Sequence, residues 1–463
     1  MDQSLSSILP RLASSVVYTP DSDGYWDSLR RWSNTGIKHA GAVIMPSEAG
    51  DISTALKWAQ EYQVDIAVKC GGHSVSGTSS SQGGLVIDLS RMNKATVDLA
   101  NKTVTAQGGA TWKEVDESAG EHGLATVGGT VNHTGIGGLT LGGGYGWLSG
   151  QYGLTIDNLL SATVVLADGR ILTASSTENS DLFWGLRGAG YNFGVVVDFT
   201  YQAYDQKSHV FAGLASFMPD KLERVIEELN ACLLSSDPRS GAICILAQPP
   251  GAPVPMVNVI VYYNGSHEEG SQHFSSLLAL EPVMNTISMI PYHQLNSLQN
   301  PMATYGDRKS FKGVFYRPPL DPGFARTIMT DFTAKVQEDP DLLASGLLLE
   351  FFDMHKVCEV PQSATAFASR SATQNGNIAL RWTDPAKDGQ HRAWAREVQA
   401  RWKAELDSKA SDTEEDVPQY INYAEPGDSV VGNIYGENLG RLQELKAKYD
   451  PHNVFNKMQP IPL

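Results

Sequence analysis

The sequence contains little positive charge for its length. Its 463 residues include 35 Lys and Arg but 51 Asp and Glu, which gives a formal net charge of −16. Nucleic acids and anionic membranes attract proteins through basic patches, and an acidic chain has no surplus of basic residues for one. We therefore expect neither nucleic acid nor a membrane to be a partner of this protein.

Metal-binding and membrane-spanning patterns are also absent. No Cys-x-x-Cys or His-x-x-x-His spacing occurs, and the few cysteines are scattered, so we expect no structural metal. No apolar run is long enough to span a bilayer. The first residues, Met1-Asp2-Gln3-Ser4, lack the basic and apolar regions of a secretory signal. We expect an intracellular, cytoplasmic protein with free thiols.

The length and the distribution of glycine indicate two domains. A chain of 463 residues exceeds what one hydrophobic core usually holds. Glycine-rich turns alternate with short strands up to Tyr204, and apolar stripes of helical and strand period follow. We expect an α+β fold with a glycine-rich α+β domain in residues 1–205 and a second α+β domain in residues 206–410. Residues 411–463 would form a C-terminal segment.

The second block predicts an antiparallel sheet backed by helices, because strands and helices are mixed within it. Leu222, Val225, Ile226 and Leu229 share one helical face, as in a helix that packs on a sheet. Residues 257–263 alternate in the manner of a half-buried strand. Other segments of this block are predicted as strands at 347–354 and 378–382 and as helices at 324–336 and 394–402.

One short motif points to a cofactor. Gly71-Gly72-His73-Ser74 follows an apolar strand at residues 66–68. The two glycines let the backbone fold closely around a ligand and accept positive φ, and successive N–H groups in such a turn form a site for an anion. The turn also holds an imidazole beside that site. A nucleophilic ring nitrogen next to a diphosphate site predicts a nucleotide cofactor that can be attached covalently.

Three further motifs follow in a fixed order. The run 128–147 is rich in glycine, residues 152–158 lead into an apolar strand, and residues 182–196 end in further glycines. Tyr420-Ile421-Asn422-Tyr423 lies near the C-terminus. In this order and spacing the set resembles the FAD-linked oxidases of the vanillyl-alcohol-oxidase type, with their PCMH-type FAD-binding domain. It is most similar to the berberine-bridge-enzyme-like branch, above all its fungal members of secondary metabolism.

The resemblance implies a two-domain FAD-binding oxidase fold with a covalently bound FAD. His73 matches the family's histidine, which is bonded through a ring nitrogen to the flavin 8α carbon and thereby raises the flavin potential. The alternative is a loop histidine that only hydrogen-bonds a phosphate or a backbone carbonyl. Bicovalent relatives carry a cysteine where this chain has Val131, so we expect a single link. Cys70 lies outside the attachment position and is expected to pack under the loop.

The family's cofactor contacts carry over to the matching positions of this chain. Its glycines would let the backbone approach the pyrophosphate and the flavin, Lys69 would pair with a phosphate, and residues 190–196 would hold the adenine half. By resemblance the terminal segment packs back on this FAD domain. No Gly-x-Gly-x-x-Gly opens a helix after an N-terminal strand, so the doubly wound dinucleotide fold is not indicated. The implied cofactor-binding residues are Lys69, Cys70, Gly71, Gly72, His73, Ser74, Gly77, Thr134, Gly135, Gly137, Gly138, Gly142, Gly143, Gly144, Gly190, Asn192, Gly194, Val196, Tyr420, Asn422 and Tyr423.

Three residues are candidates for catalysis: Tyr420, Tyr423 and Glu350. The tyrosines match a family strand beside the flavin, where one can take a substrate proton. The alternative is aromatic packing, because a phenol with an ordinary pKa near 10 is a poor base. Glu350 shares a face of an apolar strand with Leu348 and Phe352, either as a base of raised pKa or as a strand-end residue that reaches solvent. Three further residues are candidates for the wall of the substrate cavity: His133, Tyr145 and His355.

The resemblance implies an oxidase that acts on a small molecule. A carbon-bound hydride would move from an alcohol, amine or phenolic carbon of a secondary metabolite to the flavin, and molecular oxygen would reoxidise the flavin to give hydrogen peroxide. One alternative is a carbohydrate oxidase, although Val131 counts against it because those relatives are usually bicovalent. Another is a flavoprotein scaffold that cyclises a ligand without net oxidation.

Overall fold

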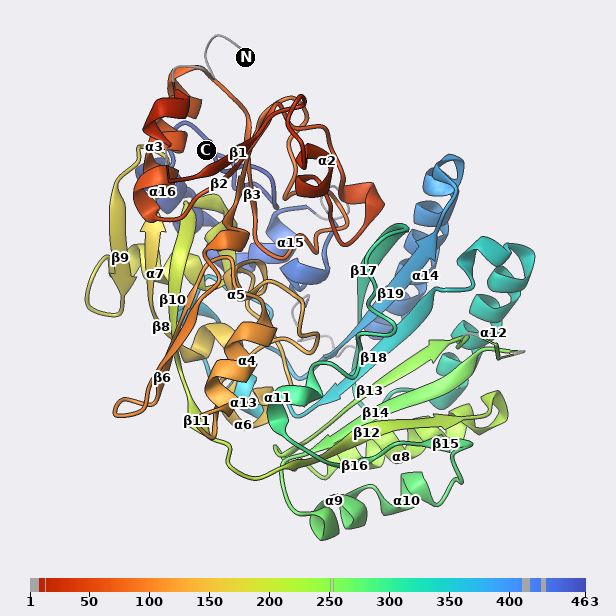
Figure 1. Ribbon diagram of the computed structural model, residues 1–463. Helices are drawn as coiled ribbons and strands as arrows, with labels where there is room; N and C mark the ends of the chain where they lie inside the picture. The colour runs from red at the N-terminus through yellow and green to blue at the C-terminus, as the bar shows by residue number, and fades with distance from the viewer. Residues whose placement is uncertain (1–7, 13, 250, 253, 410–416, 426–429) are drawn as a thin grey trace.

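The computed structural model describes the chain except for residues 1–7, 13, 250, 253, 410–416 and 426–429 (Figure 1). The first part of the chain builds two larger sheets. Strands β2, β4 and β3 of one sheet are parallel, and β1 joins them antiparallel. The strand order of this sheet is β1 (Val16–Tyr18), β2 (Ala42–Met45), β4 (Leu85–Asp88), β3 (Ile66–Lys69). The other sheet is antiparallel, in the order β5 (Ala95–Asp98), β6 (Thr103–Gln107), β10 (Val195–Gln202), β8 (Leu159–Val165), β9 (Ile171–Ser175).

Apolar helix faces cover these two sheets. The buried side chains of α3 (Ala49–Glu61) join the core of the β1–β4 sheet. Helices α4 (Trp112–Gly120) and α7 (Ser180–Ala189) share a second core with the antiparallel sheet. Shorter elements of this part are α2 (Tyr25–Ser28), β7 (Leu124–Ala125), α5 (Ile136–Leu141), α6 (Ser149–Tyr152) and β11 (Tyr204–Asp205).

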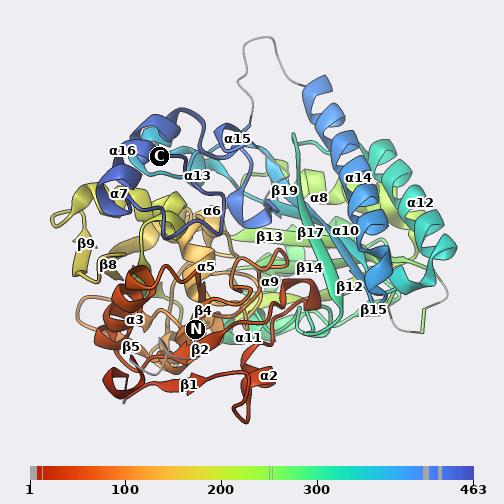
Figure 2. The same ribbon diagram turned by 90° about the horizontal axis from the view of Figure 1, so that it is seen from above.

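The second part of the chain forms one large antiparallel sheet. Its order is β15 (Met284–Asn285), β12 (Val210–Phe217), β14 (Met256–Tyr263), β13 (Ser240–Ala247), β18 (Gly346–Phe352), β19 (Gln374–Trp382), β17 (Arg308–Tyr316), with β16 (Ser288–Ile290) also paired to β12. The expected antiparallel sheet backed by helices is thereby confirmed. The helices on the face turned away from the first part are α8 (Leu222–Leu234), α12 (Pro322–Glu338) and α14 (Asp388–Ser408) (Figure 2). Shorter helices are α9 (His267–His273), α10 (Ser275–Leu278), α11 (Tyr292–Leu295) and α13 (His355–Cys358).

Strand β14 differs from the half-buried strand that its alternation predicts, because all eight of its residues are buried. Val257, Val259 and Val261 pack under the helices. Ile260 and Tyr262 on the opposite face join a separate core that includes side chains of the first part of the chain. A period of two shows that a strand has two unlike faces, but it does not show that a second domain covers the other face.

The C-terminal segment lies against the first part of the chain. Leu442 and Leu445 of α16 (Leu439–Tyr449) join the same core as α7, and Lys446 and Asp450 form a fully buried ion pair of 2.7 Å. The expected strand at residues 420–423 is instead a single 3-10 turn, Ile421–Tyr423, followed by α15 (Gly432–Tyr435). The predicted boundary at 410–411 lies outside the described residues.

Two absences hold for the described residues alone. None of their helices combines the length and the apolar character needed to cross a membrane. No group of three or more His, Cys, Asp or Glu side chains in this part of the chain is placed to hold a metal ion.

Candidate active site

A cavity of about 1010 Å³ lies between the two parts of the chain. Its wall combines the loop after β3, the loop before α5, the start of β10, the helix-free face of the large sheet and the turn at residues 420–425. The volume is at the upper end of the usual range for small-molecule sites, about 300–1,000 Å³. The space is therefore large enough for an extended cofactor together with a small substrate.

Two glycine loops close tightly on each other at one end of the cavity. A Cβ atom at Gly71 would collide with the backbone of Gly135, and a Cβ at Gly135 would collide with Gly71 and with the sulfur of Cys70. Gly72 has a φ of +70°, which favours glycine. The result is a wall of bare backbone that lets a ligand approach closely. The residues therefore fit the diphosphate of a dinucleotide such as FAD.

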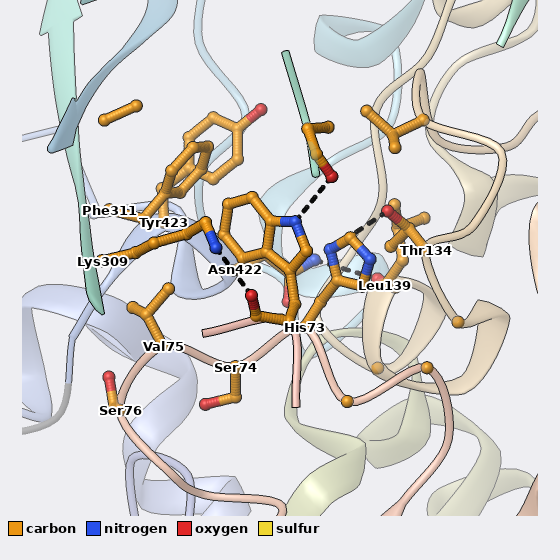
Figure 3. Close-up of a pocket in the computed structure, with 18 of the residues that line it drawn as sticks. His73, Ser74, Val75, Ser76, Thr134, Leu139, Lys309, Phe311, Asn422 and Tyr423 are labelled. Carbon is orange, nitrogen blue, oxygen red and sulfur yellow. Dashed lines mark hydrogen bonds between the residues drawn. The ribbon is translucent and has the colours of Figure 1, made fainter. Parts of the chain in front are cut away.

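His73 is held in one orientation at the end of this wall. Its ring stacks on Trp32, with the ring centroids 5.1 Å apart and an angle of 5° between the planes. Its Nε2 lies 2.8 Å from Nδ1 of His133, and its Nδ1 lies 3.5 Å from the hydroxyl of Thr134. Figure 3 shows His73 with Thr134 and Leu139 on one side of the close-up and Lys309 on the other.

The surroundings keep His73 neutral. Burial, followed by the nearby His133 and Lys309, lowers the pKa of His73 to about 3. The ammonium group of Lys309 lies 4.6 Å above the Trp32 ring and donates to the Trp32 carbonyl at 2.7 Å. Burial, followed by the charge of Arg381, lowers the pKa of Lys309 itself to about 8. A neutral imidazole keeps a free electron pair on one nitrogen and is therefore a competent nucleophile at neutral pH.

Most of the predicted cofactor residues lie on the cavity wall. They are Cys70, Gly71, Gly72, His73, Ser74, Thr134, Gly135, Gly137, Gly138, Gly194, Val196, Tyr420, Asn422 and Tyr423. Cys70 donates to the Ala110 carbonyl at 3.3 Å, and burial raises the pKa of its thiol to about 11. This agrees with a cysteine packed under the loop. Val131 also lines the cavity.

The remaining predicted cofactor residues lie behind that wall. The Lys69 ammonium pairs with Asp88 at 2.7 Å, so its charge is already neutralised within the protein. Asn192 accepts from the Ile461 backbone at 3.1 Å and donates to the Tyr435 hydroxyl at 3.2 Å, which ties down the C-terminal segment. Glycines in this group make room for neighbouring side chains and backbone: Gly77, Gly142, Gly143, Gly144 and Gly190. Direct contact of this group with a cofactor stays a prediction.

Glu350 projects from β18 into the cavity and pairs with Tyr423. The Tyr423 hydroxyl donates to Glu350 Oε1 at 2.6 Å. Burial raises the pKa of Glu350 to about 7, while hydrogen bonds from Tyr423 and Asn375 oppose that shift. The side chain is only 7% exposed, so the alternative of a strand-end residue that reaches solvent is wrong. Its Oε2 is buried and has no hydrogen-bond partner among the described residues.

Tyr420 is oriented by a second set of hydrogen bonds. The Asn422 amide donates to the Tyr420 hydroxyl at 2.8 Å, and the Tyr191 hydroxyl donates to the Asn422 carbonyl oxygen. The ring of Tyr420 meets Tyr145 edge-on, with the centroids 4.8 Å apart. Burial raises the pKa of Tyr420 and that of Tyr423. Neither phenol can serve as a base by itself at neutral pH, whereas the Tyr423–Glu350 pair includes a carboxylate that can.

The other three candidates for the wall of the substrate cavity do not lie together. Tyr145 lines the cavity, whereas His133 contacts His73 at the cofactor end. The His355 side chain is 77% exposed and hydrogen-bonds Asp353 at 2.7 Å, so it lies outside the site. Sequence reasoning did not single out several residues of the site. Tyr191 lies within the motif 182–196, whereas the others belong to no motif: Trp32, Lys309, Phe311 and Asn375. The strand predicted at 378–382 begins earlier in the structure, at Gln374 of β19, and thereby includes Asn375.

The comparisons with known proteins agree with this geometry. The model for an FAD binding domain matches residues 40–175, and the model for berberine and berberine-like proteins matches residues 419–462. The FAD-linked oxidoreductase pgmH of Aspergillus terreus is 35% identical over 449 residues, which cover 94% of this chain and 91% of the relative. The FAD-linked oxidoreductase hasG of Aspergillus fumigatus is 31% identical over 97% of both chains.

Solved structures share the whole fold. The 6-hydroxy-D-nicotine oxidase of Arthrobacter nicotinovorans has a TM-score of 0.81 at 25% identity and covers 97% of this chain, with 98% of its own chain matched. The glucooligosaccharide oxidase of Acremonium strictum, described with a 6-S-cysteinyl, 8α-N1-histidyl FAD, has a TM-score of 0.82 at 24% identity and 99% coverage of both chains. At 24% identity, the similarity to the glucooligosaccharide oxidase shows a shared fold and nothing more.

Proposed function

The chain belongs to the berberine-like FAD-linked oxidoreductases, and we propose that it is an oxidase of a small secondary metabolite. It removes a hydride from an alcohol, amine or phenolic carbon and passes the electrons to molecular oxygen, which leaves as hydrogen peroxide. The observation that carries this proposal is the Tyr423–Glu350 pair in the cavity wall, 2.6 Å apart. It offers a proton acceptor at the place where a substrate would meet the cofactor.

FAD would be held by the two glycine loops and by a bond to His73. When bound, FAD supplies a ring that accepts a hydride. Gly71, Gly72 and Gly135 present backbone to the diphosphate, and the start of β10 borders the same wall. Nδ1 of the neutral His73 would form the covalent bond, and Val131, which has no nucleophilic atom, would permit no second one. Burial keeps the Cys70 thiol protonated, so this nearby sulfur is not available for a second bond to the flavin.

The Tyr423–Glu350 pair removes a proton from the substrate O–H or N–H. The substrate donates to the Tyr423 oxygen while Tyr423 passes its own proton to Glu350 Oε1. A phenol of raised pKa thereby gains the basicity of the carboxylate next to it. The Glu350 carboxylate accepts this proton only while it is ionised, so its pKa of about 7 places the change of state near neutral pH. Asn375, which hydrogen-bonds Glu350, keeps the carboxylate in place.

The wall opposite the cofactor end favours an apolar substrate over a sugar. Leu214, Ile243, Ile245 and Leu348 of the large sheet line the cavity, and Phe311 borders them. A sugar buried against this surface would lose hydrogen bonds to water without replacement, at a cost of about 1–3 kcal/mol for each unpaired group. A largely apolar metabolite with one oxidisable carbon fits this wall better.

Oxygen is expected to reoxidise the reduced flavin. Enzyme reduced under anaerobic conditions and then mixed with air-saturated buffer in a stopped-flow instrument should recover the oxidised spectrum and form hydrogen peroxide. A flavin that stays reduced for minutes while an artificial acceptor reoxidises it would show a dehydrogenase instead. A panel of biosynthetic intermediates and sugars, scored for anaerobic bleaching, tests the substrate class. A ligand that binds without bleaching the flavin would support the cyclase scaffold.

The rate of flavin reduction is expected to rise with pH through about 7. Burial raises the pKa of Glu350 to about 7, so the carboxyl group is neutral and unable to accept a proton below that value. Below this pH the reduction rate should fall about tenfold for each unit, and above it the rate should level off. Stopped-flow reduction with saturating substrate between about pH 5 and 9 measures the profile. A flat profile in this range would contradict the assignment of Glu350.

A further inference from the structure

Two histidines from distant parts of the chain are in direct contact at the cofactor end of the cavity. His73 Nε2 and His133 Nδ1 are 2.8 Å apart, although 60 residues separate them in the sequence. The ring centroids lie 4.9 Å apart. At this distance one nitrogen must carry the hydrogen and the other must accept it, so the contact couples the protonation states of the two rings.

The contact with His133 involves one particular nitrogen of His73. Nε2 of His73 is the nitrogen that faces His133, at 2.8 Å from its Nδ1, so Nδ1 of His73 is the nitrogen left for a cofactor. When Nε2 of His73 carries the hydrogen and donates to His133 Nδ1, the electron pair of His73 stands on Nδ1.

Neighbouring side chains prevent the His73 ring from turning over. Trp32 stacks on one face, and Tyr305 meets the ring edge-on with the centroids 6.0 Å apart. Trp32 Nε1 donates to the Ala303 carbonyl at 2.8 Å, and the Trp32 backbone N–H donates to the Gly72 carbonyl at 3.0 Å. The stack, the histidine pair and the Ala303 carbonyl therefore form one connected unit around the ring.

We propose that His133 is a positioning residue for the attachment of FAD: it makes Nδ1 of His73 the nucleophile and accepts the Nε2 proton as the bond forms. The inference rests on the proposed covalent role of His73. His73 Nδ1 forms a bond to the flavin 8α-methyl carbon, and that carbon loses one hydrogen. The second hydrogen is the Nε2 proton, which passes through His133. The two electrons and two protons released in this way would reduce the flavin ring, and molecular oxygen would then take them up as hydrogen peroxide.

The test measures attachment separately from turnover. Wild type, His133→Ala and His133→Asn are produced with FAD, and the fraction of flavin that stays with the acid-precipitated protein is followed during incubation in air. We expect His133→Ala to bind FAD in the native state and to attach it about a hundredfold more slowly, the usual effect of losing a positioned acid or base. In His133→Asn the amide oxygen can accept from His73 but cannot take its proton, so attachment should proceed at an intermediate rate.

The control is His355→Ala, which removes an exposed histidine far from the site and should attach FAD as fast as the wild type. His133→Asn also serves if the alanine variant does not fold. Attachment at the wild-type rate in His133→Ala would overturn the proposal, and His133→Asn no faster than His133→Ala would overturn its hydrogen-bonding part. A wild type whose FAD is released by acid would instead contradict the bond to His73, so the two failures are distinguishable.

Discussion

His73→Ala is expected to release all of its FAD on acid precipitation, whereas the wild type keeps the yellow chromophore in the pellet. The side chain supplies a nucleophile in a reactive form beside the glycine loops, because His73 is held neutral with a pKa of about 3. The other nearby candidate, Cys70, stays protonated with a pKa of about 11. The variant should still bind FAD reversibly, since the glycine loops are unchanged. Its flavin should be reduced about tenfold more slowly, because the covalent bond raises the flavin potential.

Peptide mass spectrometry provides the direct measurement for this variant. A tryptic peptide of the wild type that contains His73 should carry the mass of FAD, and the corresponding peptide of His73→Ala should not. Native flavin content, read from the absorbance spectrum before precipitation, is the control for folding. FAD free in the supernatant of precipitated wild type, or a flavin bonded to Cys70, would refute the single histidyl link.

The parts of the site that sequence could predict are those that follow from local backbone chemistry. Gly71 and Gly72 predict a close approach of backbone, and the structure presses this loop against Gly135. The apolar faces of α8 and α12 predicted their packing on a sheet, since each face repeats with the period of a helix. Patterns of this kind depend on residues that are close together in the sequence, so they can be recognised without knowledge of the tertiary structure.

The parts that sequence could not predict depend on contacts between distant segments. His133 appeared as a candidate for the substrate cavity, but its partner is His73, which lies on another loop. Trp32 belongs to no motif and becomes significant only because it stacks on that ring. Glu350 was placed on the correct strand, yet its exposure depends on whether another domain covers that face of the sheet. The 3-10 turn at residues 421–423 replaces an expected strand, and it brings Asn422 within hydrogen-bond reach of Tyr420.

Tyr423→Phe and Glu350→Gln should each lower the rate of flavin reduction by roughly ten- to a thousandfold, at or somewhat below the usual range for loss of a general base. Tyr423→Phe removes the hydroxyl that makes the hydrogen bond of 2.6 Å, and Glu350→Gln leaves an amide oxygen that can accept this bond but cannot take its proton. Glu350→Gln should also remove the rise of the rate through about pH 7, because the group that titrates there is gone. Stopped-flow reduction under anaerobic conditions measures both effects, with unchanged flavin content and spectrum as the control.

The double variant distinguishes a coupled pair from two separate contributions. If Tyr423 and Glu350 act as one proton acceptor, the variant with both substitutions should be about as slow as the slower single variant, because groups that act as a unit give strongly non-additive effects. Tyr420→Phe is the matched comparison, since it removes a phenol of the same cavity that bonds Asn422 rather than the carboxylate. Multiplied effects in the double variant would show that the two groups act independently. Wild-type rates in Tyr423→Phe with a large loss in Tyr420→Phe would move the proton acceptor to Tyr420.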